Sequence, residues 1–381
     1  MKNISPIEER EQDYNYKKDN LTSPSQVLRK LIENSIDAKS SNIEIRIELN
    51  GLNIIEVKDD GIAMSPQEMM ISVEKGSKIN NLNNKIFSSH GKSLNRISKV
   101  SKLEIISKEK SKTRGAVLNI SNDKIHPIKE CYADIGTKIQ VRDLFYNNAN
   151  IRDIVKKSKS DDLIKVINTY ALAFPEISFT AKSNNKIILD APKEDKFSKN
   201  IFISRIKNVL GNKIIKSIIN FKNESNELSV NFFYTNESNS FKRKNYQFMF
   251  INNRHVYEEK IIKIINDLYK QTFSEADYPA FVLFIESNEE LLNISKISDD
   301  KITIENKNIV KMLKSLFLNA FAEEIYKDKS KNKENSNLLN NPVGFHDKYE
   351  ISQSNKGLII KDKDKNKKIE ITLESIEKNF K

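Results

Sequence analysis

Two polar side chains, Asn34 and Asp59, occupy positions where binding chemistry is expected. Asn34 lies in PSQVLRKLIENSIDA, residues 24–38, whose apolar residues recur with the 3.6-residue period of one helix face. It follows Val27 by seven residues, so its amide sits at the edge of the apolar stripe and needs a partner. Asp59 begins an Asp-Asp-Gly corner. An amide for a metal ion and a carboxylate for the adenine amino group would together build an ATP site.

The elements that must position these side chains can be predicted from the surrounding residues. Ser23 is a suitable N-cap, and Pro24 fits the first helical position. After the helix, isoleucines alternate with polar residues up to Leu49, an Asn50-Gly51 pair predicts a turn, and a second strand, residues 52–57, leads into the corner. We therefore expect a helix packed on an antiparallel sheet, with Asn34 and Asp59 close together.

With these motifs the chain resembles the MutL family of mismatch-repair proteins, members of the GHKL ATPases. The first motif, E-L-V/I-E-N-S-x-D-A, is similar to residues 30–38, and the second, D-N-G-x-G-M/I, to residues 59–64. Residues 136–147, GTKIQVRDLFYN, resemble the block G-T-x-V-x-V-x-x-L-F-Y-N, which separates the MutL branch from other ATPases of the superfamily. Four further segments resemble other motifs of the family more weakly: residues 76–79, 91–94, 250–256 and 278–284.

The resemblance implies an α+β fold with two domains and a tail. Residues 1–22 are expected to be a polar arm, in which the apolar arm of the family is not found. Residues 23–152 would form a GHKL helix-on-antiparallel-sheet domain, and 153–325 a ribosomal-S5-like α/β domain that begins at a charged connector. Residues 326–381 are rich in charge and are predicted to be largely disordered. No endonuclease motif such as D-Q-H-A-x-x-E occurs in the sequence.

The resemblance also implies ATP and Mg²⁺ as cofactors. Asn34 takes the place of the metal-binding amide and Asp59 that of the adenine-binding carboxylate. The full set of nucleotide-binding positions carried over is Asn34, Asp59, Gly61, Met64, Ser77, Lys78, Gly91, Lys92, Thr137 and Lys301.

The position of the general base holds Lys30, one helical turn before Asn34. An ammonium cannot accept a proton at neutral pH unless its pKa falls by several units, and a nearby triphosphate acts in the opposite direction. Loss of a general base typically slows a reaction about 10²–10⁴-fold. Glu33 directly precedes Asn34, so it points about 100° away from Asn34 around the helix axis and is a poor substitute for the base. Ala63 replaces a glycine of the adenine corner. We therefore expect a chain that binds ATP but hydrolyses it weakly or not at all.

A net charge of +12 favours a nucleic-acid partner. The general abundance of Lys, Asn and Ile offers another explanation, since an AT-rich coding sequence produces the same bias. The candidate DNA-binding residues are Arg152, Lys156, Lys157, Lys242, Arg243, Lys244 and Arg254, with Arg205 and Lys207 as further candidates.

The family implies three partners: double-stranded DNA, a MutL/Mlh-type heterodimer partner and a MutS-type mismatch recognition complex. An Asp300-Lys301 pair favours the PMS-type branch, and with it the nucleus, if the chain is eukaryotic; otherwise the cytoplasm is expected. No run of 18 apolar residues occurs, and the single Cys131 excludes an internal disulfide.

Two alternatives remain open. One is a DNA-binding or scaffold module that keeps the fold but no longer binds nucleotide. The other is a different superfamily member, such as a chaperone or topoisomerase subunit, against which the LFYN block argues.

Overall fold

The fold is taken from a computed structural model of the chain. The residues it describes are 21–74, 93–158, 161–195, 197–198, 200–225, 227–273, 276–296, 301–334, 349–354, 357–362 and 367–372. The chain divides into two compact units, Met1–Ala322 and Glu323–Lys381.

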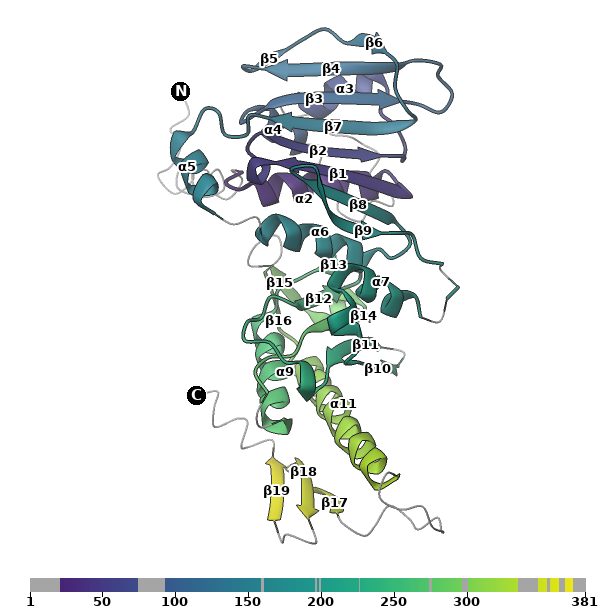
Figure 1. Cartoon of the computed structure of the whole chain (residues 1–381), viewed down its shortest axis with the longest axis vertical. Coiled ribbons are helices and arrows are strands. Elements are labelled where there is room, and N and C mark those ends of the chain that lie inside the picture. The colour runs from purple at the N-terminus through teal and green to yellow at the C-terminus, as the bar shows by residue number, and fades with distance from the viewer. Residues whose placement is uncertain are drawn as a thin grey trace. The chain divides into compact units, whose positions relative to one another are not determined.

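The first unit contains a nine-stranded sheet (Figure 1). Its strands are β1 Asn42–Glu48, β2 Ile54–Asp59, β3 Lys102–Lys108, β4 Gly115–Ser121, β5 Lys124–Ile125, β6 Lys129–Cys131, β7 Gly136–Arg142, β8 Ser178–Ser183 and β9 Lys186–Ala191. The order is β5-β4-β3-β7-β2-β1-β8-β9, with β6 paired to β4. Only β1 and β8 pair in parallel. The sheet thus continues past residue 153, where the sequence suggested a second domain.

The two faces of this sheet differ in chemistry because successive side chains of a strand point to opposite sides. The three isoleucines of β1 are buried, whereas Arg46 between them lies on the polar face. Arg46 forms ion pairs with Glu48 at 2.7 Å and with Glu56 of β2 at 3.1 Å, and Gln140 of β7 also donates to Glu56. One face is therefore solvated and held by cross-strand polar contacts, and the other is available for packing.

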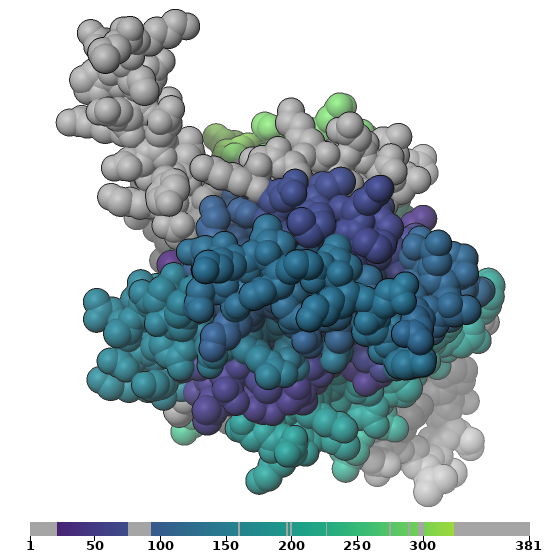
Figure 2. Space-filling view, turned by 90° about the horizontal axis from the view of Figure 1, so that it is seen from above, coloured from purple at the N-terminus to yellow at the C-terminus, as the bar shows by residue number. Residues whose placement is uncertain are grey.

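Helices cover the apolar face. The helices of the first unit begin with α2 Pro24–Asp37, α3 Pro66–Val73, α4 Ser93–Ser98, α5 Ala149–Lys157 and α6 Asp161–Ala173. Contacts join α2 to β2, α3 to β4, and α4 to β3, and α6 packs against α2 (Figure 1). Figure 2 looks onto the β4 edge, where the β3–β4 region, in blue, forms the surface. The expected helix-on-sheet architecture is confirmed.

A second, five-stranded sheet follows in the same unit. It consists of β10 Ile218–Glu224, β11 Leu228–Thr235, β12 Gln247–Ile251, β13 Arg254–His255 and β14 Phe281–Ser287, in the order β10-β11-β14-β12-β13. The helices around it are α7 Ile201–Leu210, α8 Asn212–Ile215, α9 Glu259–Thr272, α10 Glu289–Leu292 and α11 Lys307–Glu334. A separate pair, β15 Ile294–Lys296 and β16 Ile302–Ile304, precedes α11.

Both faces of this second sheet are covered. On one side, Phe202 of α7 contacts Phe233 of β11 with ring centroids 6.0 Å apart. On the other side, the neighbouring Phe232 contacts Phe317 of α11 at 5.1 Å. All five residues of β12 are buried, as expected for a strand with no solvated face.

Several local expectations are corrected by the structure. The charged stretch expected to be a connector contains α5, which Asn148 caps by accepting from the Ile151 amide at 3.1 Å. Leu49 does not continue the buried alternation of β1, because it lies in a 3-10 turn with φ 49° and is 65% exposed. Residues 124–131 form two short strands, β5 and β6, and the segment from Ile214 completes α8 before β10 begins at Ile218.

The second unit contains an antiparallel three-stranded sheet, with strands β17 Tyr349–Ser354, β18 Gly357–Asp362 and β19 Lys367–Thr372. None of the helices in the described ranges is both long enough and apolar enough to cross a membrane.

Candidate nucleotide site

The helix that carries Asn34 begins as its sequence predicts. The Ser23 hydroxyl accepts from the Gln26 amide at 3.3 Å, and the Gln26 side chain accepts from the Ser23 amide, which completes a capping box. The apolar stripe of α2 is buried, and Asn34 is half-buried at its edge. No described residue hydrogen-bonds the Asn34 side chain. This amide therefore remains available for a ligand.

Asp59, the last residue of β2, is fastened to α2 by a buried hydrogen bond. The Ser35 hydroxyl, next to Asn34, donates to Asp59 Oδ2 at 2.7 Å. The Gly61 amide donates to Oδ1 at 3.0 Å. These bonds join the two predicted motifs in one corner, with the Asp59 carboxylate 7% exposed.

The Asp59 carboxyl titrates in an unusual range. Burial raises its pKa from the ordinary 3.8 to about 6, against the hydrogen bonds from Ser35 and Gly61, which favour the charged form. At pH 7 the group is mainly ionised and can accept a hydrogen bond from an amino group. Near pH 5 it is mainly protonated and loses that capacity at one oxygen.

Two glycines let the backbone close around Asp59. A Cβ on Gly136, which has φ 112°, would lie 2.0 Å from the Asp59 carbonyl oxygen. A Cβ on Gly61 would lie 2.6 Å from the Ala38 carbonyl oxygen, which accepts the Ile62 amide at 2.7 Å. The corner is thus packed at backbone distance, and neither position tolerates a side chain without movement.

The floor of the corner is completed by hydroxyl groups from β3 and β7. Thr137, paired with Asp59 across the sheet, is buried, and its hydroxyl lies 3.0 Å from that of Ser107. The Ser107 hydroxyl also lies 2.8 Å from the Met64 amide, from which it accepts. Ala63, where the family has glycine, does not adopt a positive φ. The loop from 61 to 64 therefore closes without a glycine at position 63.

Lys30 does not stand alone on its helix face. Its ammonium lies 2.9 Å from Glu33 Oε2, and the hydroxyl of Tyr170 on α6 donates to Glu33 Oε1 at 2.7 Å. Glu33 and Tyr170 are buried, and Lys30 is half-buried. The carboxylate nearest to the general-base position is therefore neutralised by Lys30 and directed toward α6.

Other predicted nucleotide positions lie elsewhere. Ser77, Lys78, Gly91 and Lys92 are outside the described residues. Lys301 lies beside α9, where its backbone bridges to Tyr257 and its ammonium is 3.5 Å from Glu259 Oε2. The described site thus consists of the corner and the part of α2 from Lys30 to Ser35.

The predicted DNA-binding residues fall into different settings. Arg205 is fully buried and donates to backbone carbonyls of residues 175, 177, 191 and 192, so the expectation that it contacts DNA is wrong. On α5, Arg152 donates to the Leu144 carbonyl at 2.9 Å, and Lys156 pairs with Asp153 at 3.5 Å. The other candidates are spread over exposed and half-buried positions: Lys157, Lys207, Lys242, Arg243, Lys244 and Arg254.

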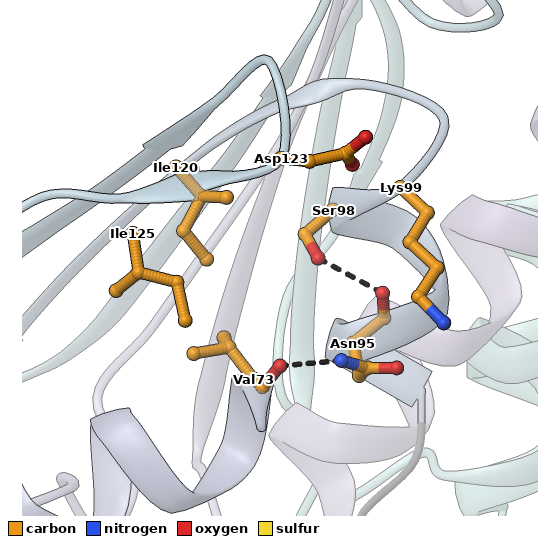
Figure 3. A pocket seen from close by; sticks show the side chains of 7 residues that line it. All are labelled: Val73, Asn95, Ser98, Lys99, Ile120, Asp123 and Ile125. Carbon is orange, nitrogen blue, oxygen red and sulfur yellow. Dashed lines mark hydrogen bonds between the residues drawn. The ribbon is translucent and has the colours of Figure 1, made fainter. Parts of the chain in front are cut away.

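A cavity of about 300 Å³ lies away from the corner, between α4 and the β4–β5 edge (Figure 3). Its lining residues are Val73, Asn95, Ser98, Lys99, Ile120, Asp123 and Ile125. The Asn95 amide donates to the Val73 carbonyl at 2.5 Å, and the Ser98 hydroxyl to the Asn95 carbonyl at 2.8 Å (Figure 3). The Asn95 and Ser98 side chains thus bond to backbone carbonyls of the lining, and none of the lining residues belongs to the Asp59 corner.

Sequence reasoning missed four members of the site. Ser35 and Glu33 lie inside the first motif but were not assigned contacts, and Ser107 and Tyr170 lie in segments without a motif. Only the burial expected for residues 33 and 35, close to the apolar stripe, could have indicated the first two. The others depend on strand pairing and helix packing. Among the described residues, no group of three or more His, Cys, Asp or Glu side chains could hold a metal ion.

Comparisons with known proteins identify relatives of both halves of the first unit. Residues 22–141 match the model "Histidine kinase-, DNA gyrase B-, and HSP90-like ATPase", and residues 206–297 match "DNA mismatch repair protein, C-terminal domain". The MutL protein of Clostridium acetobutylicum is 31% identical over 71% of this chain and 44% of its own length. The MutL protein of Halothermothrix orenii is 28% identical over 87% and 52%, respectively. The chain spans about half the length of these relatives.

Solved structures agree on the fold. The crystal structure of the N-terminal domain of a DNA repair protein matches with a TM-score of 0.67 at 20% identity, over 81% of this chain and 96% of that one. The Aquifex aeolicus MutL ATPase domain, complexed with ADP, matches with a TM-score of 0.55 at 23% identity, over 71% and 93%.

Proposed function

Because the chain belongs to the MutL family of DNA mismatch repair proteins, we propose that it acts in mismatch repair as a nucleotide-binding module with impaired hydrolysis. Asn34 holds Mg²⁺, Asp59 accepts from the adenine amino group, and Gly61, Met64 and Thr137 shape the corner. Ser77, Lys78, Gly91 and Lys92 would contact the phosphates, whereas Lys301, which lies beside α9, is not part of the described corner.

The observation that carries the binding half of this proposal is the Ser35–Asp59 hydrogen bond of 2.7 Å, which joins the first and second motifs. It favours the charged form of a buried carboxylate, and Ser35 is preceded on α2 by Asn34, whose amide no described side chain engages. A buried carboxylate with a perturbed pKa beside an available polar group is typical of a binding site rather than of a packed core. The ATPase family model also covers this whole corner.

The impaired hydrolysis follows from the chemistry at residue 30. The ammonium of Lys30 is a donor held by Glu33, so it offers no lone pair to an attacking water. Glu33 is engaged by both Lys30 and Tyr170, and its carboxylate is directed toward α6. When bound, Mg²⁺ would neutralise charge on the phosphates. The chain's own residues bind and orient the nucleotide but supply no general base.

The wider role is proposed from the family. Partners of this chemistry would be double-stranded DNA, a MutL/Mlh-type subunit and a MutS-type complex. The PMS-type affiliation suggested by residues 300–301 stays a prediction, and so does the nuclear location tied to it. The relatives named above are bacterial, which favours a bacterial MutL-type protein.

The deciding experiment measures binding and turnover separately on the full chain. The unaltered protein should bind an adenine nucleotide with Mg²⁺ and show turnover at or near background. Lys30→Glu should raise turnover by about 10²–10⁴-fold, because it returns a carboxylate to the helix face of Asn34. The matched control is Lys30→Gln, which removes the ammonium without adding a base and should bind nucleotide with no gain in rate.

Each contrary result has a definite meaning. Turnover in the unaltered chain equal to that of Lys30→Glu would refute the lost-base argument. A rate gain in Lys30→Gln equal to that in Lys30→Glu would show that the ammonium inhibits and that some other group is the base. No nucleotide binding by the unaltered chain would favour the alternative function, a scaffold that keeps the fold only.

A further inference from the structure

Five cations gather on one surface of the second half of the first unit. Three are consecutive in the loop from Phe241 to Tyr246, which joins β11 to β12, and the other two come from α8 and α9. We call these residues the cationic loop surface: Lys213, Lys242, Arg243, Lys244 and Lys270. All five are exposed.

Aromatic contacts connect three of these cations, and Lys242 and Arg243 directly precede Lys244 in the loop. The Lys213 ammonium lies 5.9 Å from the ring centroid of Phe241, and the Lys244 and Lys270 ammoniums lie 5.0 and 4.0 Å from that of Tyr278. Phe241 and Tyr278 are themselves joined by reciprocal backbone hydrogen bonds of 2.8 and 3.0 Å. Residues from three separate segments are therefore held side by side.

The loop is anchored at both ends. Tyr278 pairs with Phe241 at one end, and at the other the Phe281 amide donates to the Tyr246 carbonyl at 2.8 Å. The side chain of Asn239, just before the loop, donates to the Lys213 carbonyl at 2.9 Å, which ties the loop to α8. The three loop cations thus project from a fixed base, and ordering them on a ligand costs less entropy than it would in a free tail.

The described part of the chain supplies no ion pair to this surface. Within the described ranges, none of the five cations forms an ion pair, and Asp277, beside Tyr278, does not pair with them either. The candidate cations of α5 behave differently, since Lys156 pairs with Asp153. A helix C-terminus accounts for Lys270 through the macrodipole, but it does not account for the loop. Unpaired and adjacent cations are suited to a polyanion.

The aromatic rings also indicate how the polyanion is bound. Two ammoniums already lie over Tyr278, and Phe241 contacts both Lys213 and Tyr246, the latter with ring centroids 4.9 Å apart. An unstacked base would have to displace these groups to stack on either ring. Contacts to the phosphates of a duplex require no such displacement.

We propose that the cationic loop surface binds the phosphate backbone of double-stranded DNA without regard to sequence. This inference rests on the proposed function and adds to it the surface through which the DNA is bound. It assigns the contact to the loop 241–246 and its neighbours rather than to α5.

The test is a salt titration of the full chain with a fluorescent duplex, read by anisotropy. The triple variant Lys242→Ala, Arg243→Ala, Lys244→Ala should bind more weakly and reduce the slope of log K against log salt by roughly 2–3, about 0.9 per lost phosphate contact. The matched control removes three exposed lysines from the β8–β9 region, Lys182→Ala, Lys186→Ala and Lys193→Ala, and should leave the slope unchanged. Thermal unfolding of each variant checks that the fold is kept.

A second variant guards against trivial loss of structure. Lys242→Arg with Lys244→Arg keeps the charges and should retain the slope of the unaltered chain. The proposal is overturned if the loop variant keeps the original slope, if the control loses as much as the loop variant, or if polyglutamate competes as well as duplex DNA at equal charge. A chain that binds no duplex at all would remove DNA from the proposed function as well, whereas nucleotide binding would still stand or fall by the Lys30 experiment.

Discussion

The corner around Asp59 and the helix α7 use buried polar groups in opposite ways. In the corner, the described partners of the Asp59 carboxylate are neutral donors, the Ser35 hydroxyl and the backbone amides of Gly61 and Thr137. On α7, Arg205, which is fully buried, donates to backbone carbonyls of four residues around the start of β8 and the end of β9. The first arrangement leaves a charge that a ligand can still approach, and the second uses a charge to fasten chain segments together.

The sheets explain this difference. The first sheet is covered by helices on one side only, so polar residues on and beside its strands can reach a ligand or solvent. The second sheet is covered on both sides by aromatic contacts to α7 and α11, and its Lys222–Glu224 ion pair lies on the edge strand β10. Chemistry is therefore expected in the first region, and surface contacts with a partner in the second.

The prediction with the largest expected effect compares a buried arginine with an exposed one. Arg205→Met should lower the free energy of unfolding by about 4 kcal/mol, because several buried carbonyls lose their donor. Arg243→Met, on the exposed loop, should change it by less than about 0.5 kcal/mol. Urea unfolding of both variants measures the difference. Equal changes in the free energy of unfolding would show that the hydrogen bonds of Arg205 do not stabilise the fold.

A second prediction concerns pH and the Asp59 corner. A folded pKa of about 6 against an ordinary 3.8 means that the folded state binds the proton more tightly than the unfolded state. Protonation of Asp59 therefore adds about 3 kcal/mol to the free energy of unfolding. This contribution is fully present below the unfolded pKa and is lost as the pH rises through about 6. Nucleotide affinity should change in the opposite sense, because the protonated carboxyl no longer accepts from the adenine amino group.

The measurement pairs unfolding with nucleotide binding at pH 5 and pH 7, in the unaltered chain and in Asp59→Asn. The variant should lose both pH dependences, since its amide does not titrate in this range. A pH dependence that persists in Asp59→Asn would assign the titration to another group.

The prediction with the smallest expected effect on stability compares two tyrosines. Tyr170→Phe removes a hydrogen bond to the buried carboxylate of Glu33 and should cost about 2 kcal/mol. Tyr234→Phe removes a bond of equal length, 2.7 Å, to the neutral Ala320 carbonyl and should cost about 1 kcal/mol. Thermal unfolding ranks the two variants, and a reversed order would show that Lys30 alone satisfies Glu33.

The parts of the fold that could be predicted are those with local causes. The N-cap Ser23, followed by Pro24, begins α2 where the sequence predicts it. The hairpin of β1 and β2 and its helix were predicted for the same reason, since alternation and period are visible over a few residues. The motif residues Asn34 and Asp59 were brought to one corner by these elements.

The parts that could not be predicted depend on distant contacts. Nothing near Arg205 in the sequence indicates that its guanidinium would meet carbonyls at residues 175–177 and 191–192, so its charge suggested a surface role. The charged residues of α5 hid a helix because its one buried side chain, Val155, gives too short a pattern to recognise. The link from Glu33 to Tyr170 spans 137 positions and has no local signature.

The parallel pairing of β1 with β8 has a practical consequence for producing the protein. Residues 42–47 pair with residues 178–183, so the nine-stranded sheet can be completed only after β8 has been synthesised. A fragment that stops near residue 153 would leave β1 as an open sheet edge, with unpaired backbone groups next to three isoleucines. Such a fragment should collect in inclusion bodies, whereas one that extends beyond β9 at Ala191 should keep that edge closed.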